Sequence, residues 1–120
     1  MFFSVIIPTL NRCDMLACAI DTLQNQTFPA NQYEIIVVDN GSTDNTKGLV
    51  ESLNKSGAKQ IRYVYEPRPG LHWARHTGAR EAKGEVLAYT DDDAEAIPEW
   101  LDRIAPAYHD ALLLLGDNAT

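Results

Sequence analysis

The stretch EIIVVD, residues 34–39, decides the fold that this sequence predicts. Its four central residues are apolar and β-branched, and a strand that is apolar on both faces is typical of a parallel sheet covered by helices on both sides. The stretch SVII, residues 4–7, has the same character and is stopped by Pro8. We therefore expect two buried strands, at residues 4–7 and 34–38, in a mainly parallel sheet.

A helix is expected between these two strands. Leu16, Ile20 and Leu23 follow the i, i+4, i+7 spacing of an amphipathic helix, and either Asn11 or Asp14 can cap its first turn. Two parallel strands need such a crossover between them, so this pattern agrees with the strand pattern.

A second helix is expected after the second strand. Ser42 and Thr43 can cap this helix, Val50 falls on its inner face, and Gly57 follows its end. The alternation of strand and helix therefore continues beyond the first crossover.

The rest of the chain keeps the same alternation. The predicted strands are residues 61–65, 86–89 and 111–115, and the predicted helices are residues 71–82, ended by Gly84, and 98–108, with Pro98 in the first turn. The order βαβαβαβ followed by αβ predicts an α/β fold, a three-layer α/β/α sandwich with a mostly parallel sheet. With 120 residues and no linker or internal repeat, residues 1–120 are expected to form one domain or part of one.

The bulk charge limits the class of partner. The formal net charge is -7 and the isoelectric point is about 4.7, whereas a nucleic-acid-binding protein normally presents a basic face. Nucleic acid is therefore not an expected partner. No stretch approaches the roughly 20 apolar residues of a membrane span, and no basic leader opens the chain. A cytoplasmic location is expected, and attachment to the inner face of a membrane stays open.

Polar clusters follow three of the predicted strands. They are PTLNR at residues 8–12, DNGS at residues 39–42 and the acidic triplet at residues 91–93. In open α/β sheets ligands bind outside the carboxyl ends of the strands, which predicts one shared site. Three adjacent carboxylates repel one another unless a cation neutralises them, and Mg²⁺ or Mn²⁺ prefers such hard oxygen ligands.

The residue types in these clusters suit a nucleoside diphosphate that carries a transferable group. The dinucleotide pattern GxGxxG and the P-loop pattern GxxxxGK[ST] are both absent. Asp39 can accept hydrogen bonds from a ribose or a base, and Arg12 or Arg75 can contact diphosphate oxygens. Asp91 to Asp93 can hold a divalent cation that neutralises a diphosphate leaving group.

Four segments carry a resemblance to a known family. They are SVIIPTLNR (4–12), YEIIVVDNGSTD (33–44), GLHWARHTG (70–78) and GEVLAYTDDD (84–93). In this order and spacing they resemble family 2 glycosyltransferases with the Rossmann-like GT-A fold, and the last segment resembles the strand that leads to the DXD motif. His76 is a departure, because Asn commonly follows the arginine in that family.

The resemblance implies an activity and a set of site residues. The activity is transfer of a sugar from a nucleotide-sugar donor, such as a UDP-sugar, to an unknown acceptor. Inversion at the anomeric carbon, dependence on Mg²⁺ or Mn²⁺ and a role in polysaccharide or cell-envelope glycan synthesis are implied with it. The implied donor-binding residues are Pro8, Thr9, Asn11, Arg12, Asp39, Arg75, Asp91 and Asp92, and the implied metal ligands are Asp93 and Asp91.

Family members are generally longer than this chain, and their second half supplies the acceptor site and the catalytic base. Glu95 and Glu99 follow the acidic triplet but match no pattern of such a base. We therefore expect residues 1–120 to be the donor-binding half of a GT-A glycosyltransferase, with little transfer activity alone and its base outside this chain.

Two other functions remain open. One is a non-catalytic module that binds a nucleotide or associates with itself through an exposed sheet edge. The other is a sugar nucleotidyltransferase, which expects a Gly-rich basic loop where this chain has residues 8–12. Single residues also have competing interpretations that involve no ligand. Asp39 can cap a helix, and Arg75 can form an ion pair at the surface. Arg12 can lie along the first helix, and residues 91–93 can form a solvated turn.

Overall fold

The computed structural model describes residues 2–55 and 60–106. Within them, four strands form one sheet in the order β3-β2-β1-β4. The strands are β1 (Phe3–Thr9), β2 (Tyr33–Asp39), β3 (Ile61–Tyr65) and β4 (Val86–Tyr89). All three neighbouring pairs are parallel, which confirms the predicted parallel sheet.

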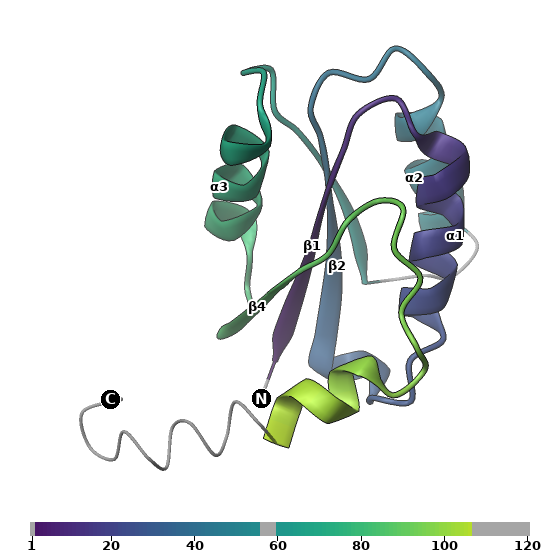
Figure 1. Ribbon diagram of the computed structural model, residues 1–120, viewed down its shortest axis with the longest axis vertical. Coiled ribbons are helices and arrows are strands. Elements are labelled where there is room, and N and C mark those ends of the chain that lie inside the picture. The colour runs from purple at the N-terminus through teal and green to yellow at the C-terminus, as the bar shows by residue number, and fades with distance from the viewer. Residues whose placement is uncertain (1, 56–59, 107–120) are drawn as a thin grey trace.

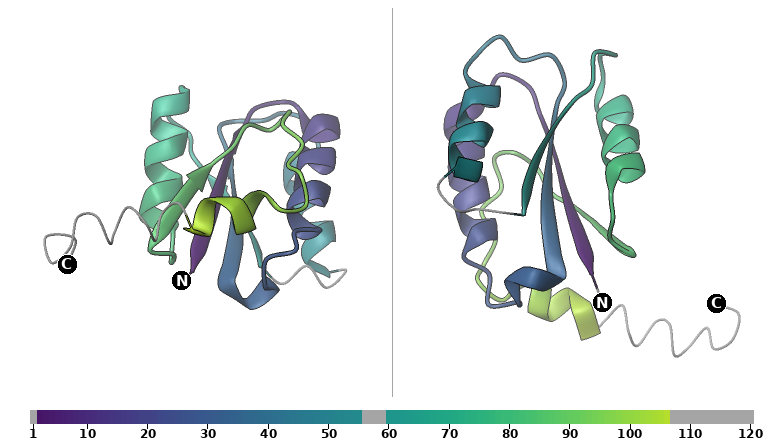
Figure 2. Two further views of the ribbon diagram at one scale, coloured as in Figure 1. Left: turned by 60° about the horizontal axis from the view of Figure 1, so that its bottom comes forward. Right: turned by 180° about the vertical axis from the view of Figure 1, so that it is seen from behind.

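Helices cover both faces of this sheet. The helices α1 (Cys13–Gln24) and α2 (Thr46–Lys55) lie on one face, and α3 (Leu71–Glu81) lies on the other (Figures 1 and 2). A short 3₁₀ turn, η1 (Ala30–Gln32), leads into β2, and residues 100–106 form a further helix. The predicted three-layer α/β/α sandwich is therefore confirmed.

Two apolar cores flank the sheet. The larger core lies between the sheet and α1 and α2, and it includes Val5, Leu16, Val37 and Leu101. The smaller core lies under α3 and consists of buried residues Ile6, Ile36, Val38 and Ala74. A fully buried large apolar side chain contributes about 1.5–3 kcal/mol, so the larger core supplies most of the stabilisation.

The first strand runs past the proline that was expected to stop it. β1 extends to Thr9, with Pro8 opposite Val38 of β2. The carbonyl of Ile6 accepts the Thr90 N–H on the β4 side, and Pro8, two residues on, faces that side just beyond the end of β4. The absence of an N–H group on Pro8 therefore costs the sheet no hydrogen bond.

The caps predicted for α1 and α2 are wrong. Asn11, which has a positive φ of 53°, accepts the N–H of Thr43 through its side chain instead of capping α1. The N–H of Cys13, at the start of α1, donates to Asp44. Asp44 also accepts the N–H of Thr46, where α2 begins, so both helix starts share one carboxylate. Ser42 and Thr43 lie before α2 rather than at its cap.

Gly84 has a different role from the predicted one. The helix α3 ends at Glu81, three residues earlier. A Cβ on Gly84 would lie 2.7 Å from the backbone nitrogen of Ser4, so glycine lets the chain pass close to β1 on its way into β4.

Some predictions fall outside the described residues. Gly57 and the strand at residues 111–115 lie there, as does the end of the helix predicted at residues 98–108, of which residues 100–106 are confirmed. In the described ranges, no helix is both long and apolar enough to cross a bilayer.

Candidate functional site

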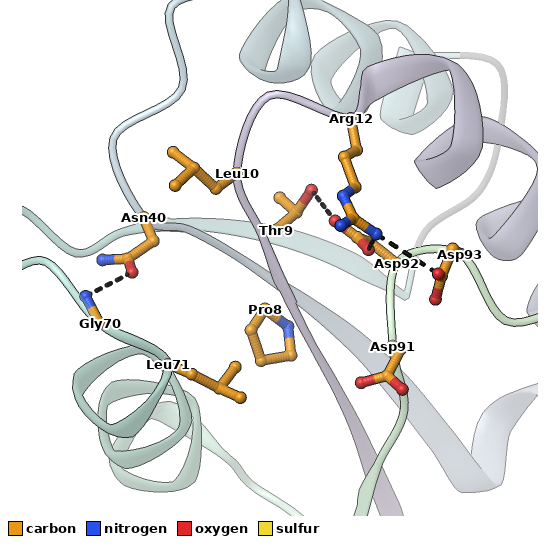
Figure 3. Close-up of a pocket in the computed structure, with 10 residues that line it drawn as sticks. All are labelled: Pro8, Thr9, Leu10, Arg12, Asn40, Gly70, Leu71, Asp91, Asp92 and Asp93. Atoms are coloured by element: carbon orange, nitrogen blue, oxygen red, sulfur yellow. Dashed lines mark hydrogen bonds and ion pairs between the residues drawn. The ribbon is translucent and has the colours of Figure 1, made fainter.

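Three strand ends meet at one edge of the sheet. In the parallel register Thr9 pairs with Asp39 and Ile6 pairs with Tyr89, so the chain after β1, β2 and β4 emerges on the same side. A pocket of about 460 Å³ opens there, which we call the rim pocket (Figure 3). Its lining includes six residues predicted for the site: Pro8, Thr9, Arg12, Asp91, Asp92 and Asp93.

Two carboxylates of the acidic triplet share one protein cation, Arg12. The guanidinium of Arg12 lies 3.5 Å from the Asp92 carboxylate and 3.3 Å from that of Asp93. The buried Asp92 also accepts the Thr9 hydroxyl at 2.9 Å. These contacts tie the end of β1 to the segment after β4 (Figure 3). The repulsion that the sequence suggested is therefore relieved in part by Arg12.

The third carboxylate, Asp91, is exposed and lies apart from the Arg12 network (Figure 3). In the part of the chain that the structure describes, its side chain makes no hydrogen bond or ion pair. It lines the rim pocket and also a second pocket on the other side. Asp91 is therefore available to a ligand from either direction.

The acidic triplet fits a cation that binds together with a phosphate ligand. It does not form a complete metal site from protein side chains alone. Among residues 2–55 and 60–106, no three His, Cys, Asp or Glu side chains are grouped as a metal site. Mg²⁺ commonly binds one or two carboxylates, waters and substrate phosphates. Asp91 and Asp93 are both exposed at the rim, so this donor set fits such a partial site.

Asp39 lies on the predicted edge but does not line the rim pocket. Its carboxylate is buried and accepts the N–H of Ser42 at 2.8 Å and the hydroxyl of Tyr63. Burial, with the hydrogen bond and charge of Asp39, raises the pKa of Tyr63 above its ordinary value. The competing interpretation of Asp39 as the cap of the second helix is wrong, because Asp39 accepts the N–H of Ser42 within the loop after β2 and it is Asp44 that accepts the N–H of Thr46, where α2 begins.

Two other predicted donor residues also lie outside the rim pocket. Arg75, on α3, is exposed and lines the second pocket beyond Asp91. Asn11 joins the loop after β1 to the loop after β2, because its backbone N–H donates to Ser42 and its side chain accepts the N–H of Thr43.

Asn40 is the main site residue that sequence reasoning missed. Its side chain donates to the carbonyls of Glu66 and Arg68 and accepts the N–H of Gly70 at 3.0 Å. Gly70 and Leu71 form the α3 side of the rim pocket, so one amide side chain fixes that wall (Figure 3). The available signal was its position directly after a buried strand.

The same wall is held by a buried carboxylate. Glu66 is 2% exposed, accepts the Thr77 hydroxyl at 2.7 Å and pairs with Arg68, whose guanidinium lies 3.9 Å from the Trp73 ring centroid. Hydrogen bonds from the Arg68 side chain and backbone, and then from Thr77, lower the pKa of Glu66 to about 2. The loop before α3 is therefore anchored to the helix as well as to β2.

With this geometry in place, comparisons identify the family. The family model for glycosyl transferase family 2 matches residues 4–113, and the chain belongs to that family. The GalNAc(5)-diNAcBac-PP-undecaprenol β-1,3-glucosyltransferase of Campylobacter jejuni is 38% identical over 96 residues, which are 78% of this chain and 30% of that protein. This chain spans about a quarter to a third of the length of its first curated relatives.

Solved structures agree with this assignment. S. aureus TarS in complex with UDP-GlcNAc has a TM-score of 0.80 and 29% identity, over 92% of this chain and 32% of that one. Mannosyltransferase PcManGT from Pyrobaculum calidifontis, in complex with GDP-Man and Mn²⁺, has a TM-score of 0.77 and 31% identity, over 82% of this chain and 30% of that one. The fold is therefore that of GT-A glycosyltransferases.

Proposed function

We propose that this chain is the donor-binding portion of a metal-dependent, inverting glycosyltransferase and that its rim pocket binds a nucleoside diphosphate sugar. The observation that carries the proposal is the convergence of Arg12, Asp91 and Asp93 on one pocket at the carboxyl ends of three parallel strands. Family membership and the nucleotide-sugar complexes of TarS and PcManGT support it.

Each rim residue has a distinct part in this proposal. Asp91 and Asp93 would hold Mg²⁺ or Mn²⁺, which supplies positive charge to a departing diphosphate. The Arg12 side chain is about half exposed while it contacts Asp92 and Asp93. It can donate its remaining N–H groups to phosphate oxygens. Asp92 is held by Thr9 and keeps the segment after β4 in place.

The wider assignments are part of the same proposal. Residues 1–120 are the donor half of a longer catalytic unit, and the base that removes the acceptor proton lies outside this chain. The C. jejuni relative is named for an undecaprenol-linked acceptor, which supports a role in envelope glycan synthesis. The cytoplasmic location, the membrane association and the sheet-edge self-association stay predictions of the sequence.

A thermal-shift series tests donor binding. UDP, GDP, ADP and CDP are added with and without Mg²⁺ or Mn²⁺. A ligand at about 100 times its dissociation constant stabilises the folded state by about 2.7 kcal/mol, which for a domain of this size raises Tm by roughly 10 °C or more. We expect a metal-dependent rise for one nucleotide. No rise with any nucleotide would contradict the proposal and favour the non-catalytic module.

A further inference from the structure

Two histidines of α3 lie outside both apolar cores and outside the lining of the rim pocket. They are His72 and His76, which are four residues apart on the helix and both exposed. The residues of α3 that face the sheet are instead Ala74, Thr77 and Gly78. The two histidines therefore lie on the outer side of the helix, where they line a further pocket of about 540 Å³.

The two imidazole rings lie side by side. Their centroids are 6.5 Å apart and their planes are inclined by 19°. In the described part of the chain, neither side chain makes a hydrogen bond or ion pair, so the ring nitrogens are open to a ligand. Positions i and i+4 of a helix bring two side chains to one face, and this is the spacing at which a pair of helical histidines binds zinc.

The ligand atoms indicate the class of ion. Imidazole nitrogen suits Zn²⁺, Ni²⁺ and Cu²⁺, whereas carboxylate oxygens such as those at the rim suit Mg²⁺ and Mn²⁺. Arg75 lines the same pocket, and its positive charge opposes a cation. That charge is exposed to solvent and screened by salt, and the chain as a whole carries a formal net charge of -7, which attracts cations.

We propose that His72 and His76 chelate one divalent transition-metal ion, Zn²⁺, Ni²⁺ or Cu²⁺, with water in its remaining positions. Because both side chains are exposed, rotation about their bonds can bring one nitrogen of each ring to about 2.0–2.1 Å from the ion. The ion links two successive turns of α3 directly after Gly70 and Leu71, which form a wall of the rim pocket.

This site is separate from the metal proposed at the rim and needs no nucleotide. It depends on His76, the position at which this chain departs from the family pattern. Relatives that carry Asn there lack the second imidazole, so the chelate is not expected in them.

Trp73 provides a local reporter of metal binding. Its ring centroid lies 5.4 Å from that of His72 and 6.4 Å from that of His76. Ni²⁺ is added to the 120-residue chain without nucleotide, because a paramagnetic ion beside an indole quenches its fluorescence. We expect a saturable loss of Trp73 emission that excess Zn²⁺ reverses and that millimolar Mg²⁺ leaves unchanged. Trp73→Phe should remove the quenching.

Variants assign the ion to the histidine pair. His72→Ala and His76→Asn each remove one of the two ligands at an exposed position, where the fold tolerates substitution. Each should lower the affinity for Ni²⁺ roughly tenfold or more, because the second ligand of a chelate binds at a high effective concentration. His109→Ala is the matched control. It removes the third histidine of the chain, which lies outside the described residues, and should leave the affinity unchanged.

Two results would overturn the inference. One is that millimolar Ni²⁺ neither quenches Trp73 nor broadens the imidazole NMR signals of His72 and His76. The other is an affinity that either His72→Ala or His76→Asn leaves unchanged, because the ion would then be held by a single imidazole or by other groups. Neither result bears on the proposed function, which is tested by nucleotide binding at the rim.

Discussion

At the scale of single residues, the three adjacent aspartates of this chain have three different environments. Asp92 is buried against Thr9, Asp93 is exposed beside Arg12, and the exposed side chain of Asp91 has no hydrogen bond or ion pair in the described residues. The sequence shows three identical side chains and cannot distinguish them. Their division into one buried carboxylate and two exposed ones follows from the pairing of β1 with β4.

Arg12→Ala separates donor binding from stability. The ion pair with Asp93 is exposed and contributes about 0–1 kcal/mol, and the buried Asp92 keeps its hydrogen bond from Thr9, so Tm should change little. A hydrogen bond to a charged ligand is worth about 1.5–3 kcal/mol, so affinity for the Mg²⁺–nucleotide should fall by about tenfold or more. Titration calorimetry measures the affinity, and Arg103→Ala, at an exposed arginine of the helix at residues 100–106, is the control. Wild-type affinity in Arg12→Ala would remove Arg12 from the proposed site.

The Glu66 carboxylate makes the stability of the folded chain depend on pH, and its hydrogen-bond partners determine the sign of that dependence. Its pKa falls from an ordinary 4.5 to about 2, because the Arg68 side chain, the Arg68 N–H and Thr77 stabilise the charged form. The folded state therefore binds fewer protons than the unfolded state in this range. The stabilisation from Glu66 is complete above about pH 4.5 and is lost as the pH falls towards 2.

Urea unfolding of the wild type and Glu66→Gln tests this sign. The difference in unfolding free energy between the two proteins should be largest near neutral pH and should shrink as the pH falls from about 4.5 to 2. A difference of the same size at both ends of the range would mean that the Glu66 charge contributes nothing to stability.

Much of the site could be predicted from residue order, but its contacts could not. Six of the predicted residues line the rim pocket because residues at and just beyond the carboxyl ends of neighbouring parallel strands gather at one edge of the sheet. Asn40 was missed, since its partners Glu66, Arg68 and Gly70 lie about 30 residues away and no local pattern marks them. The pairing of Arg12 with Asp92 and Asp93 crosses 80 residues and is equally invisible.

At the scale of elements, α3 is the part that connects packing to the site. Its start forms a wall of the rim pocket, and its middle lies against the sheet at Gly78. A Cβ at Gly78 would lie 2.5 Å from Ile6 Cγ2 and 3.2 Å from Val38 Cγ2. Only glycine permits this close approach of the helix to β1 and β2.

Gly78→Ala should therefore push α3 away from the sheet. Overpacking of this kind costs about 1–3 kcal/mol, which thermal or urea unfolding measures directly. Nucleotide affinity should fall as well, because Gly70 and Leu71 move with the helix. Arg80→Ala, at an exposed position of the same helix, should change stability by about 0.5 kcal/mol or less. Unchanged stability in Gly78→Ala would contradict the close packing described here.

Element types were easier to predict than element ends. The apolar run of β2 and the β-branched and aromatic residues of β3 favour strands, and both strands lie within one residue of their expected bounds. The caps failed because Asn11 and Asp44 exchange partners across two loops, so that the loop after β2 caps the helix after β1. Local capping rules cannot anticipate such an exchange.

At the scale of the whole molecule, the two ends of the parallel strands have different roles. At the end opposite the rim, the buried Glu34 accepts hydrogen bonds from Ser4, Arg62 and the Lys83 N–H. Burial raises the pKa of Glu34, but these hydrogen bonds and the Arg62 charge outweigh burial and leave it below its ordinary value. That end therefore holds a fully partnered carboxylate, whereas the rim holds Asp91, whose exposed side chain has no hydrogen bond or ion pair in the described residues.

This contrast provides the most direct test of the central claim, that the rim binds a metal-bridged nucleoside diphosphate. Mn²⁺ is paramagnetic and broadens the amide NMR signals of nearby residues. In the presence of UDP or GDP, substoichiometric Mn²⁺ should broaden the signals of residues 9–12 and 91–93 and leave those of Glu34, Arg62 and Lys83 sharp. Broadening centred on Glu34, or no nucleotide-dependent broadening at the rim, would contradict the account.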